Sequence, residues 1–388
     1  MNLELMQAPA AEIGFKGEIL DCDAHLYMEP DTMAEIVGEI GGGFVLEHVR
    51  NQYATEQFHK DKEAGKTDVW NIKGLGALGA YDAEERVAAM DAMGVAQQLV
   101  FPNTALRELR IDSDAARAAM RRYNDFVIPW TRSTGGRARA VCQINMSQLD
   151  PAIAELDRVL ASGATGILLS CASPPGGVSP ANEAWDPFWA RLEEADVPAL
   201  LHLSSGGLLT SDADDPVIPP REFSEARALK ASFAMRPGAE EAIGPFFMLV
   251  AHLPVETYLI SLVMGGVFER FPRLRFGVIE CGAGWLGPMA ERMEQHVELL
   301  AKVGVTYPLR PKEYIRRNVR ITPFWHESID TMVERHGMDE VYVFSTDYPH
   351  VEGTRNPIGR FKKTMNTVGK DYDRKFFVEN AKLLFPGA

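Results

Sequence analysis

Ile19-Leu20-Asp21-Cys22-Asp23-Ala24-His25 begins apolar and ends in a carboxylate and an imidazole two residues apart. Because side chains alternate along a strand, Asp23 and His25 are expected to project to the same side. Seven more short apolar runs, bounded by turn or breaker residues, lie at residues 97–101, 138–144, 165–170, 199–203, 275–280, 319–322 and 341–346. With residues 19–23 as the first, this repetition predicts eight buried strands.

Amphipathic stretches separate these runs. AEERVAAMDAMG predicts a helix that begins at a capping box of Asp82 and Glu85, and ETYLISLVMGGVFERFP predicts another that ends at Pro272. Eight strands that alternate with helices predict the α/β class and one closed (β/α)8 barrel, or TIM barrel. The chain has 388 residues, 46% of them hydrophobic and 24% charged, which suits one large core, so residues 1–388 are expected to form a single domain.

Two segments, residues 29–81 and 204–254, are longer than a minimal barrel requires. Each follows the carboxyl end of a predicted strand, and barrel enzymes build their active sites at that face. We therefore expect both segments to form lids and pocket walls rather than a second domain.

Composition excludes several classes of function. The formal net charge of −14 and the absence of a Lys/Arg-rich run argue against a nucleic-acid partner. No stretch of 18 apolar residues predicts a membrane span, and the first residues lack the features of a secretion signal. The four cysteines are scattered without a CxxC pair, which argues against a disulfide framework. A cytoplasmic enzyme with a small-molecule substrate is the expectation.

Potential metal ligands stand at the ends of three predicted strands. The first ends in Asp23 and His25, the fifth in His202 and the eighth in Asp347. Two imidazoles and two carboxylates suit one divalent ion per chain, Zn²⁺ first and Mn²⁺ second, with room for a bound water. Each residue alone could instead be a helix cap or a buried core residue. Their coincidence at strand ends of one barrel favours a metal site.

Longer motifs resemble the amidohydrolase-related family that includes aminocarboxymuconate-semialdehyde decarboxylase and the resorcylate and carboxyvanillate decarboxylases. The resemblance rests on Asp21-Cys-Asp-Ala-His25, on Leu201-His202, on residues 265–285 and on Phe344-Ser-Thr-Asp-Tyr-Pro-His350. It implies the same barrel, metal ligation by Asp23, His25, His202 and Asp347, and a homodimer. It also implies a departure, because the decarboxylases of the family carry a histidine where this chain has Glu280.

Further residues are candidates for catalysis and substrate binding. As its family counterpart implies, Asp347 would take a proton from a metal-bound water. Glu280 is either a proton shuttle, an orienter of a ligand histidine or a neutral structural acid. His252 either protonates a leaving group, binds a substrate carboxylate or makes a helix-terminal hydrogen bond. His350, Trp285 and His326 are candidates for substrate binding, with Trp325 beside them, although the tryptophans could equally pack as apolar residues.

Three functions remain open. The first is a metal-dependent hydrolase of a small cyclic or carboxylated compound, favoured by Glu280. The alternative is a non-oxidative decarboxylase or C–C lyase of an aromatic or muconate-like acid, favoured by the family motifs. The third is a non-catalytic binding barrel.

Gly74-Leu-Gly-Ala-Leu-Gly79 matches a dinucleotide fingerprint but follows no buried strand, so we interpret it as a loop. No G-x-S-x-G motif of a serine hydrolase is present.

Overall fold

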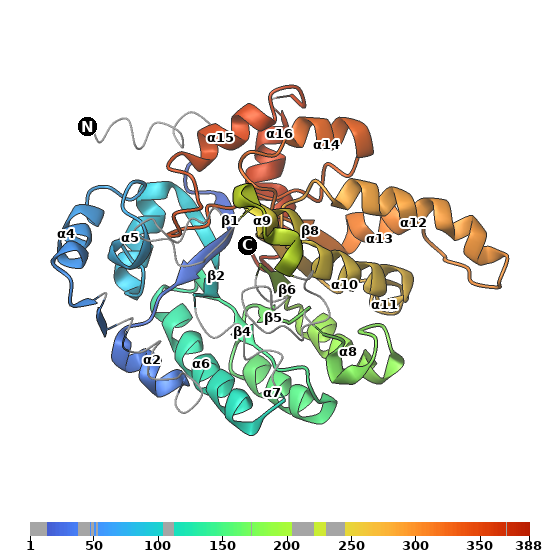
Figure 1. The fold of residues 1–388 in the computed structure, drawn as a ribbon, viewed down its shortest axis with the longest axis horizontal. Helices are drawn as coiled ribbons and strands as arrows, with labels where there is room; N and C mark the ends of the chain where they lie inside the picture. The colour runs from blue at the N-terminus through green and yellow to red at the C-terminus, as the bar shows by residue number, and fades with distance from the viewer. Residues whose placement is uncertain are drawn as a thin grey trace.

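Parallel strands form the centre of the molecule and helices surround them (Figure 1). The structure is a computed structural model that describes residues 14–37, 47, 50–51, 53–103, 112–171, 173–203, 221–229, 245–369 and 371–388. One sheet has the order β1 (Ile19–Leu26), β2 (Val95–Pro102) and β3 (Ala138–Ala140). The other has the order β4 (Cys142–Gln143), β5 (Ile167–Leu168), β6 (Ala199–His202), β7 (Phe276–Ile279) and β8 (Val319–Ile321).

Backbone hydrogen bonds join the two sheets into one ring. Only Val141 separates β3 from β4, and its N–H donates to Val100 O of β2. The predicted eighth strand, residues 341–346, forms bridges instead of a continuous ladder: Tyr342 pairs with Ile321 of β8, and Phe344 O accepts from Cys22 N of β1. These contacts place the segment between β8 and β1, as an eighth strand must lie in a closed (β/α)8 barrel.

A continuous apolar cluster fills the ring. It draws side chains from most strands and from the carboxyl-terminal segment, and its members include Leu20, Leu99, Val141, Leu168, Leu200, Ile279, Val343, Leu384 and Phe385. The side chains that point into the barrel are apolar along most of each strand. Polar side chains of the interior therefore occur mainly at the carboxyl ends of the strands. The barrel interior is therefore a packed core, and the chemistry lies at its mouth.

The outer layer consists of helices. They are α5 (Ala83–Met93), α6 (Asp114–Ser133), α7 (Leu149–Ala161), α8 (Asp186–Ala195), α10 (Leu253–Met264), α11 (Val267–Arg270), α12 (Leu286–Ala301), α13 (Pro311–Asn318), α14 (Ile329–His336), α15 (Pro357–Thr364) and α16 (Asp371–Arg374). Asp82 caps α5 as its spacing predicts, since its carboxylate accepts from Glu85 N at 2.8 Å. The helix predicted over residues 256–272 is wrong in one respect. It breaks into α10 and α11 at Gly266, whose φ of 78° interrupts the helical backbone.

Both predicted insertions are described in part. The first contains α2 (Pro30–Val37), α4 (Glu56–Gly65) and a short helical turn over Gly74–Gly76. It ends close to the barrel mouth, where Gly74 N donates to Pro349 O. The second contributes residues 221–229 and α9 (Pro245–Val250), whereas residues 204–220 and 230–244 lie outside the described residues. Within the described chain, no helix combines the length and apolarity that crossing a bilayer requires.

Tight packing explains the glycine motif that mimics a dinucleotide fingerprint. Gly79 has a φ of 69°, and a Cβ built on it would lie 2.3 Å from Arg86 Cα in α5. Only glycine satisfies both conditions. The loop interpretation of this motif fits its position between α4 and α5.

Candidate active site

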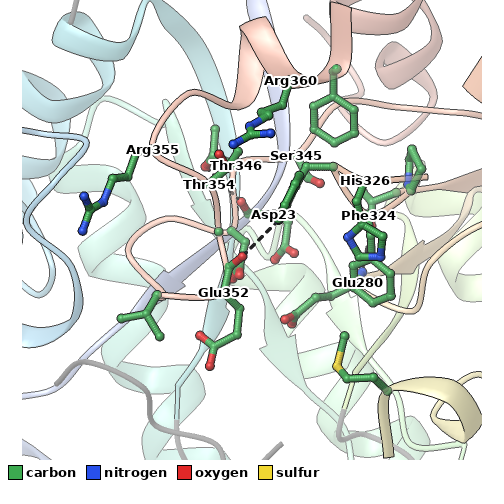
Figure 2. A pocket seen from close by; sticks show the side chains of 18 residues that line it. Asp23, Glu280, Phe324, His326, Ser345, Thr346, Glu352, Thr354, Arg355 and Arg360 are labelled. Carbon is green, nitrogen blue, oxygen red and sulfur yellow. Dashed lines mark hydrogen bonds between the residues drawn. The ribbon is translucent and has the colours of Figure 1, made fainter. Parts of the chain in front are cut away.

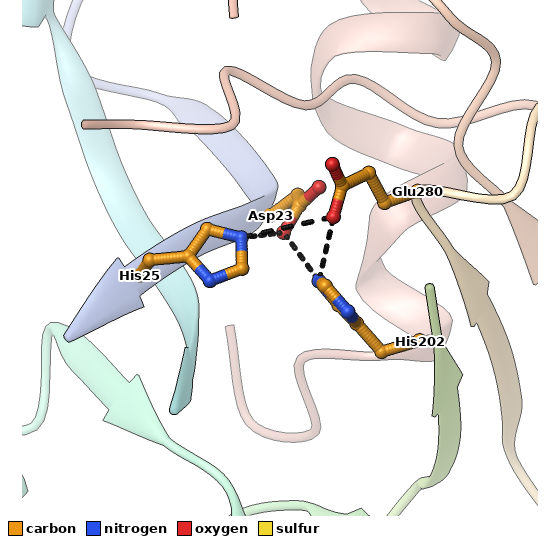
Figure 3. A group of neighbouring side chains, drawn as sticks. All are labelled: Asp23, His25, His202 and Glu280. Atoms are coloured by element: carbon orange, nitrogen blue, oxygen red, sulfur yellow. Dashed lines mark hydrogen bonds and ion pairs between the residues drawn. The ribbon is translucent and has the colours of Figure 1, made fainter. Parts of the chain in front are cut away.

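Four buried side chains from three strand ends converge at the barrel mouth (Figure 3). His202 Nε2 lies 3.3 Å from Asp23 Oδ1 and 3.2 Å from Glu280 Oε2. His25 Nε2 lies 3.4 Å from Asp23 Oδ1 and 3.9 Å from Glu280 Oε2. One donor atom from each residue falls within 4.8 Å of all the others, which is the spacing of ligands around a single ion.

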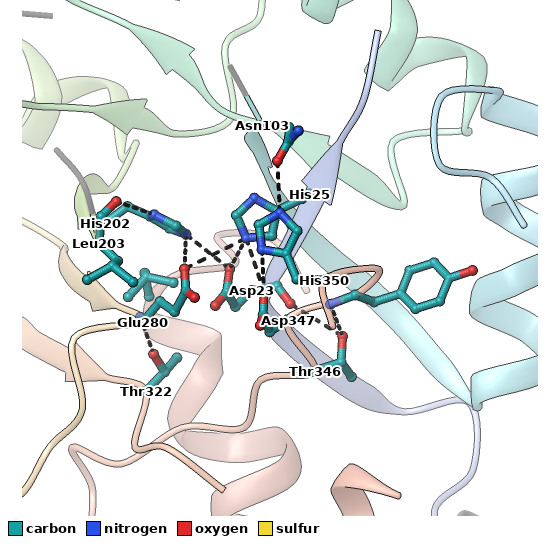
Figure 4. A network of polar contacts seen from close by, with 12 residues as sticks. Asp23, His25, Asn103, His202, Leu203, Glu280, Thr322, Thr346, Asp347 and His350 are labelled. Carbon is teal, nitrogen blue, oxygen red and sulfur yellow. Dashed lines mark hydrogen bonds and ion pairs between the residues drawn. The ribbon is translucent and has the colours of Figure 1, made fainter. Parts of the chain in front are cut away.

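Asp347 and His350 extend this group on one side (Figure 4). Asp347 Oδ1 lies 3.3 Å from His25 Nε2 and 3.0 Å from His350 Nδ1. The rings of His25 and His350 stack with centroids 3.6 Å apart. The structure thus brings together all four predicted metal ligands, and it adds Glu280 and His350 to them.

Local backbone geometry turns these carboxylates toward the centre. A register shift between Asp21 and Ala24 interrupts the β1–β2 ladder beside Asp23. Glu280 and Asp347 adopt positive φ values of 59° and 52°, which are uncommon for residues other than glycine. Strained backbone of this kind concentrates at functional sites because the surrounding structure must hold it in place.

Hydrogen bonds orient the histidines from behind. His202 Nδ1 lies 2.8 Å from Leu203 O, and a carbonyl only accepts, so Nδ1 carries the hydrogen. His350 Nε2 likewise lies 2.8 Å from Asn103 Oδ1. In both rings the other nitrogen then presents a lone pair to the cluster, as histidines that bind metals do.

Asp21 organises the base of the cluster, a role that was not predicted from the sequence. Its carboxylate accepts from Thr346 N at 2.8 Å, Thr346 Oγ1 at 2.6 Å and Gln98 Nε2 at 2.8 Å. These bonds tie β1 to β2 and to the segment that carries Asp347. Burial raises the pKa of Asp21 to about 7, although the hydrogen bonds oppose this shift. An acidic residue inside an otherwise apolar run was the available signal.

The polar atoms of the cluster fit a divalent cation. Burial alone would raise the pKa of Asp347, but the neighbouring imidazoles of His350 and His25 outweigh it and hold this pKa well below its usual range. Burial likewise opposes ionisation of Asp23, but its contacts with His202 and His25 outweigh burial and lower its pKa. Both ring nitrogens of His25 and Asp347 Oδ1 are buried without a hydrogen-bond partner among the described residues. A cation beside His25 Nε2 and Asp347 Oδ1 would satisfy these two atoms and balance the carboxylates.

A cavity of about 600 Å³ opens onto this cluster (Figure 2). Asp23, Glu280 and Asp347 line one part of it. Aromatic side chains and two guanidinium groups line the rest, and the most prominent are Phe324, Trp325, His326, Phe361, Arg355 and Arg360. The Arg360 guanidinium carbon lies 5.0 Å from the centre of the Trp325 ring, and Figure 2 shows Arg360 and Glu280 at opposite ends of the cavity. An apolar cavity with an anchoring cation suits a planar organic anion.

His252 and Trp285, which were candidates for catalysis and substrate binding, lie apart from this cavity. His252 stacks on Trp285 with ring centroids 5.9 Å apart, and its Nε2 lies 3.6 Å from Glu256 Oε2. Burial lowers the pKa of His252, so the ring is neutral at pH 7. Trp285 donates to Gly282 O at 2.9 Å. Neither residue belongs to the cavity lining, whereas His326 does.

Lys73 is a buried cation that sequence reasoning overlooked. Its Nζ has no hydrogen-bond partner among the described residues and lies 5.7 Å from the centre of the Tyr348 ring. Burial lowers the pKa of this amine to about 8, although the charge of Asp347 opposes the shift. The folded protein therefore binds this proton less readily than the unfolded chain does.

Lys73→Met is expected to stabilise the protein at pH 7 by about 1–3 kcal/mol, because it removes the cost of burying a charge. Between pH 8 and the ordinary lysine value of 10.5, the unfolded wild type holds the proton that the folded protein releases, so wild-type stability rises with pH. The gain of the variant should therefore shrink across this window. Urea unfolding of the wild type and the variant from pH 7 to 10 measures this difference in the free energy of unfolding. Exposed Lys66, changed to Met, is the control, and a pH-independent loss of stability in Lys73→Met would contradict the account.

Comparisons with known proteins identify the family and the fold of this chain. A family model described as Amidohydrolase (Amidohydro_2) matches residues 21–387. A gamma-resorcylate decarboxylase from Polaromonas sp. (strain JS666) is 24% identical over 283 residues, which cover 69% of this chain and 76% of the relative.

Solved structures show the same fold. An amidohydrolase from Mycobacterium avium subsp. paratuberculosis K-10 superposes with a TM-score of 0.68 and 21% identity, covering 95% of this chain and 99% of that one. A dihydroxybenzoic acid decarboxylase from Polaromonas sp. JS666 was solved with bound manganese and the inhibitor 2-nitroresorcinol. It superposes with a TM-score of 0.60 and 19% identity, covering 95% of this chain and 97% of that one. The resemblance found in the sequence and the predicted TIM barrel are confirmed. The chain is an enzyme that belongs to the amidohydrolase family.

Proposed function

We propose that this enzyme is a metal-dependent, non-oxidative decarboxylase of an aromatic or muconate-like carboxylic acid. The observation that carries the proposal is the cavity, in which aromatic walls and Arg360 lead to a cluster of potential metal ligands. The names of the relatives point the same way, and they favour this alternative over the hydrolase that the sequence analysis ranked first.

The residues proposed to hold the ion are Asp23, His25, His202 and Asp347. A bound divalent ion would orient the substrate oxygens and stabilise negative charge that develops on them. The residue types favour Zn²⁺ first and Mn²⁺ second, but manganese in the Polaromonas decarboxylase makes Mn²⁺ the first ion to test.

Asp347 is the residue best placed to move a proton. Because nearby histidines keep it ionised, it can take the proton of an incoming carboxylic acid or phenol. It can return that proton to the ring carbon as the bond from this carbon to the carboxylate breaks. The electron pair of that bond then becomes the new C–H bond and CO₂ leaves, so no oxidant or reductant is needed. Phe324 and Phe361 would hold the ring and exclude water.

Hydrolysis remains a second candidate because of Glu280. Its Oε2 lies 3.2 Å from His202 Nε2, within the cluster, where a carboxylate can accept a proton from water. A lactone or amide in the same cavity would then be attacked by water rather than lose CO₂.

One product analysis separates the two candidates. The manganese-loaded enzyme is incubated with a panel of hydroxybenzoic acids, including 2,6-dihydroxybenzoate, and with simple aryl lactones, in D₂O and in ¹⁸O-labelled water. Decarboxylation predicts release of CO₂ and one deuterium on the ring carbon. Incorporation of ¹⁸O into the product without CO₂ release would replace the decarboxylase proposal with the hydrolase.

Arg360 is expected to bind a substrate anion. It is exposed on one side, stacks on Trp325 and has no carboxylate partner among the described residues. Arg360→Met should raise KM for the preferred acid about 10-fold with little change in kcat, since a charge-assisted hydrogen bond contributes roughly 1.5 kcal/mol or more. Steady-state kinetics beside Arg374→Met, which alters a distant surface arginine, measure the effect. A fall in kcat at unchanged KM would argue against this role.

A further inference from the structure

We propose that a second cavity, between α6 and α7, binds a small hydroxy carboxylic acid. This site lies on the side of the barrel, apart from the barrel mouth. The inference does not depend on which reaction the enzyme catalyses.

The second cavity has a volume of about 450 Å³ and is lined by residues of α6, α7 and β4 and of the segment after β4. The two helices lie beside each other (Figure 1), and Asn124 Nδ2 of α6 donates to Glu155 Oε1 of α7 at 2.8 Å. No described residue lines both this cavity and the one at the barrel mouth. The volume is in the range of sites for small organic molecules, whereas an inorganic ion would fill only a small part of it.

Gln143 of β4 is a fully buried residue in the lining of this cavity. Its backbone is paired, because its N–H donates to Asn124 Oδ1 at 2.8 Å and its carbonyl accepts from Asn124 Nδ2 at 2.9 Å. In its side-chain amide, by contrast, neither the nitrogen nor the oxygen has a hydrogen-bond partner among the described residues.

The unpaired amide of Gln143 indicates which groups a ligand should carry. A buried amide without partners costs free energy, so a ligand that both accepts and donates a hydrogen bond would be stabilised beside it. A carboxylate accepts and a hydroxyl donates. A hydroxyl next to a carboxylate therefore offers both functions within the reach of one amide.

Charges around the cavity favour a ligand with a single anionic group. Arg117 and Arg158 line the cavity, but each has acidic partners at 2.7 Å or less. Glu155, the acid in the described lining, is one of the partners of Arg158. Arg121, four residues after Arg117 on the same face of α6, is exposed and forms no ion pair within the described part of the chain. Its uncompensated charge suits one carboxylate.

Apolar side chains complete the lining. Met120, which belongs to the apolar cluster that fills the barrel, lines the cavity together with Pro151 and Ala154. These surfaces suit a hydrocarbon body on the ligand. A multiply charged anion such as phosphate would meet the apolar walls and leave part of its charge uncompensated. The lining thus favours a hydroxy acid with an apolar body.

The test uses mandelate, which has a hydroxyl beside its carboxylate and a phenyl ring as its apolar body. Isothermal titration calorimetry of the full-length protein measures Kd. Phenylacetate lacks the hydroxyl and 1-phenyl-1,2-ethanediol lacks the carboxylate. Each should bind about 10-fold or more weakly than mandelate, because each loses a hydrogen bond to a buried or charged group.

Two variants locate the binding site. Arg121→Met removes the unpaired guanidinium and should raise Kd for mandelate about 10-fold. Gln143→Met should raise Kd by a similar factor. Because it also removes the unpaired buried amide, its free energy of unfolding in urea should be equal to or higher than that of the wild type. A purely structural role of Gln143 would give a loss of stability instead. Arg374→Met, which alters a distant surface arginine, should bind mandelate like the wild type.

Three results would overturn the inference. The first is no mandelate binding to the wild type up to millimolar concentration. The second is an unchanged Kd for mandelate in Arg121→Met or in folded Gln143→Met, which would place the binding elsewhere. The third is phosphate binding as tight as that of mandelate. Circular dichroism checks folding, and exposed Arg121 decides the matter if Gln143→Met does not fold. Failure of the proposed decarboxylation is scored separately, by the absence of CO₂.

Discussion

His202→Ala is expected to lose its catalytic metal and to lower kcat/KM by about 10³-fold or more. The imidazole supplies a nitrogen 3.3 Å from Asp23 and 3.2 Å from Glu280, and no other described side chain reaches this position from β6. Without it, two carboxylates face each other in a buried site with one ligand fewer. Loss of the charge stabilisation that an ion provides costs several kcal/mol, and each 1.36 kcal/mol corresponds to a factor of ten.

Metal content and activity are measured together in this experiment. The variant and the wild type are loaded with Mn²⁺ in parallel, bound metal is counted, and product formation is followed. His296→Ala, in the exposed part of α12, controls for the loss of a histidine that binds no ion. A His202→Ala enzyme that retained both its metal and its turnover would show that the cluster is not the catalytic centre.

Asp347→Asn should lower kcat by about 10²–10⁴-fold, because an amide of nearly the same shape cannot carry the proton. The substitution keeps one oxygen that can face His25, so the metal should remain bound. The defect is then in proton transfer rather than in assembly of the site. This separates Asp347 from His202, whose loss removes the ion itself.

The pH profile tests the assignment further. Contacts with His350 and His25 keep the pKa of Asp347 low, so the carboxylate is ionised throughout pH 6–9. Replacing it should therefore reduce kcat evenly across pH 6–9 and should not move an apparent pKa. Activity of Asp347→Asn that returned at one end of this range would assign the proton to another group.

The positions of the proposed ligands in the sequence were sufficient to predict that these side chains meet at one place in the fold. Apolar runs followed by Asp23, His25, His202 and Asp347 marked strand ends, and in a closed parallel barrel those ends meet at one face. The capped start of α5 was equally readable, because Asp82 acts on Glu85 three residues away. A helix cap joins residues only a few positions apart in the chain, so the sequence shows both partners together.

Other features depended on residues far apart in the chain. The break between α10 and α11 requires the left-handed backbone of Gly266, although ETYLISLVMGGVFERFP has continuous helical character. His350 remains a candidate for substrate binding, and only the structure shows that its ring stacks 3.6 Å from that of His25, beside Asp347. Lys73 had no signal of its own, since its burial results from the return of the insertion to the barrel mouth at Pro349.

The sequence by itself determined the fold class, the residue types at the strand ends and the family of the enzyme. Only the tertiary structure decided that Glu280 and His350 stand beside those ligands and that Asp21 holds Thr346 across 325 residues of chain. The physical reason is that strand periodicity assigns a side chain to a face of the barrel. Its distance to other side chains depends on register and on local backbone turns, such as the positive φ of Glu280 and Asp347, which packing from distant segments imposes.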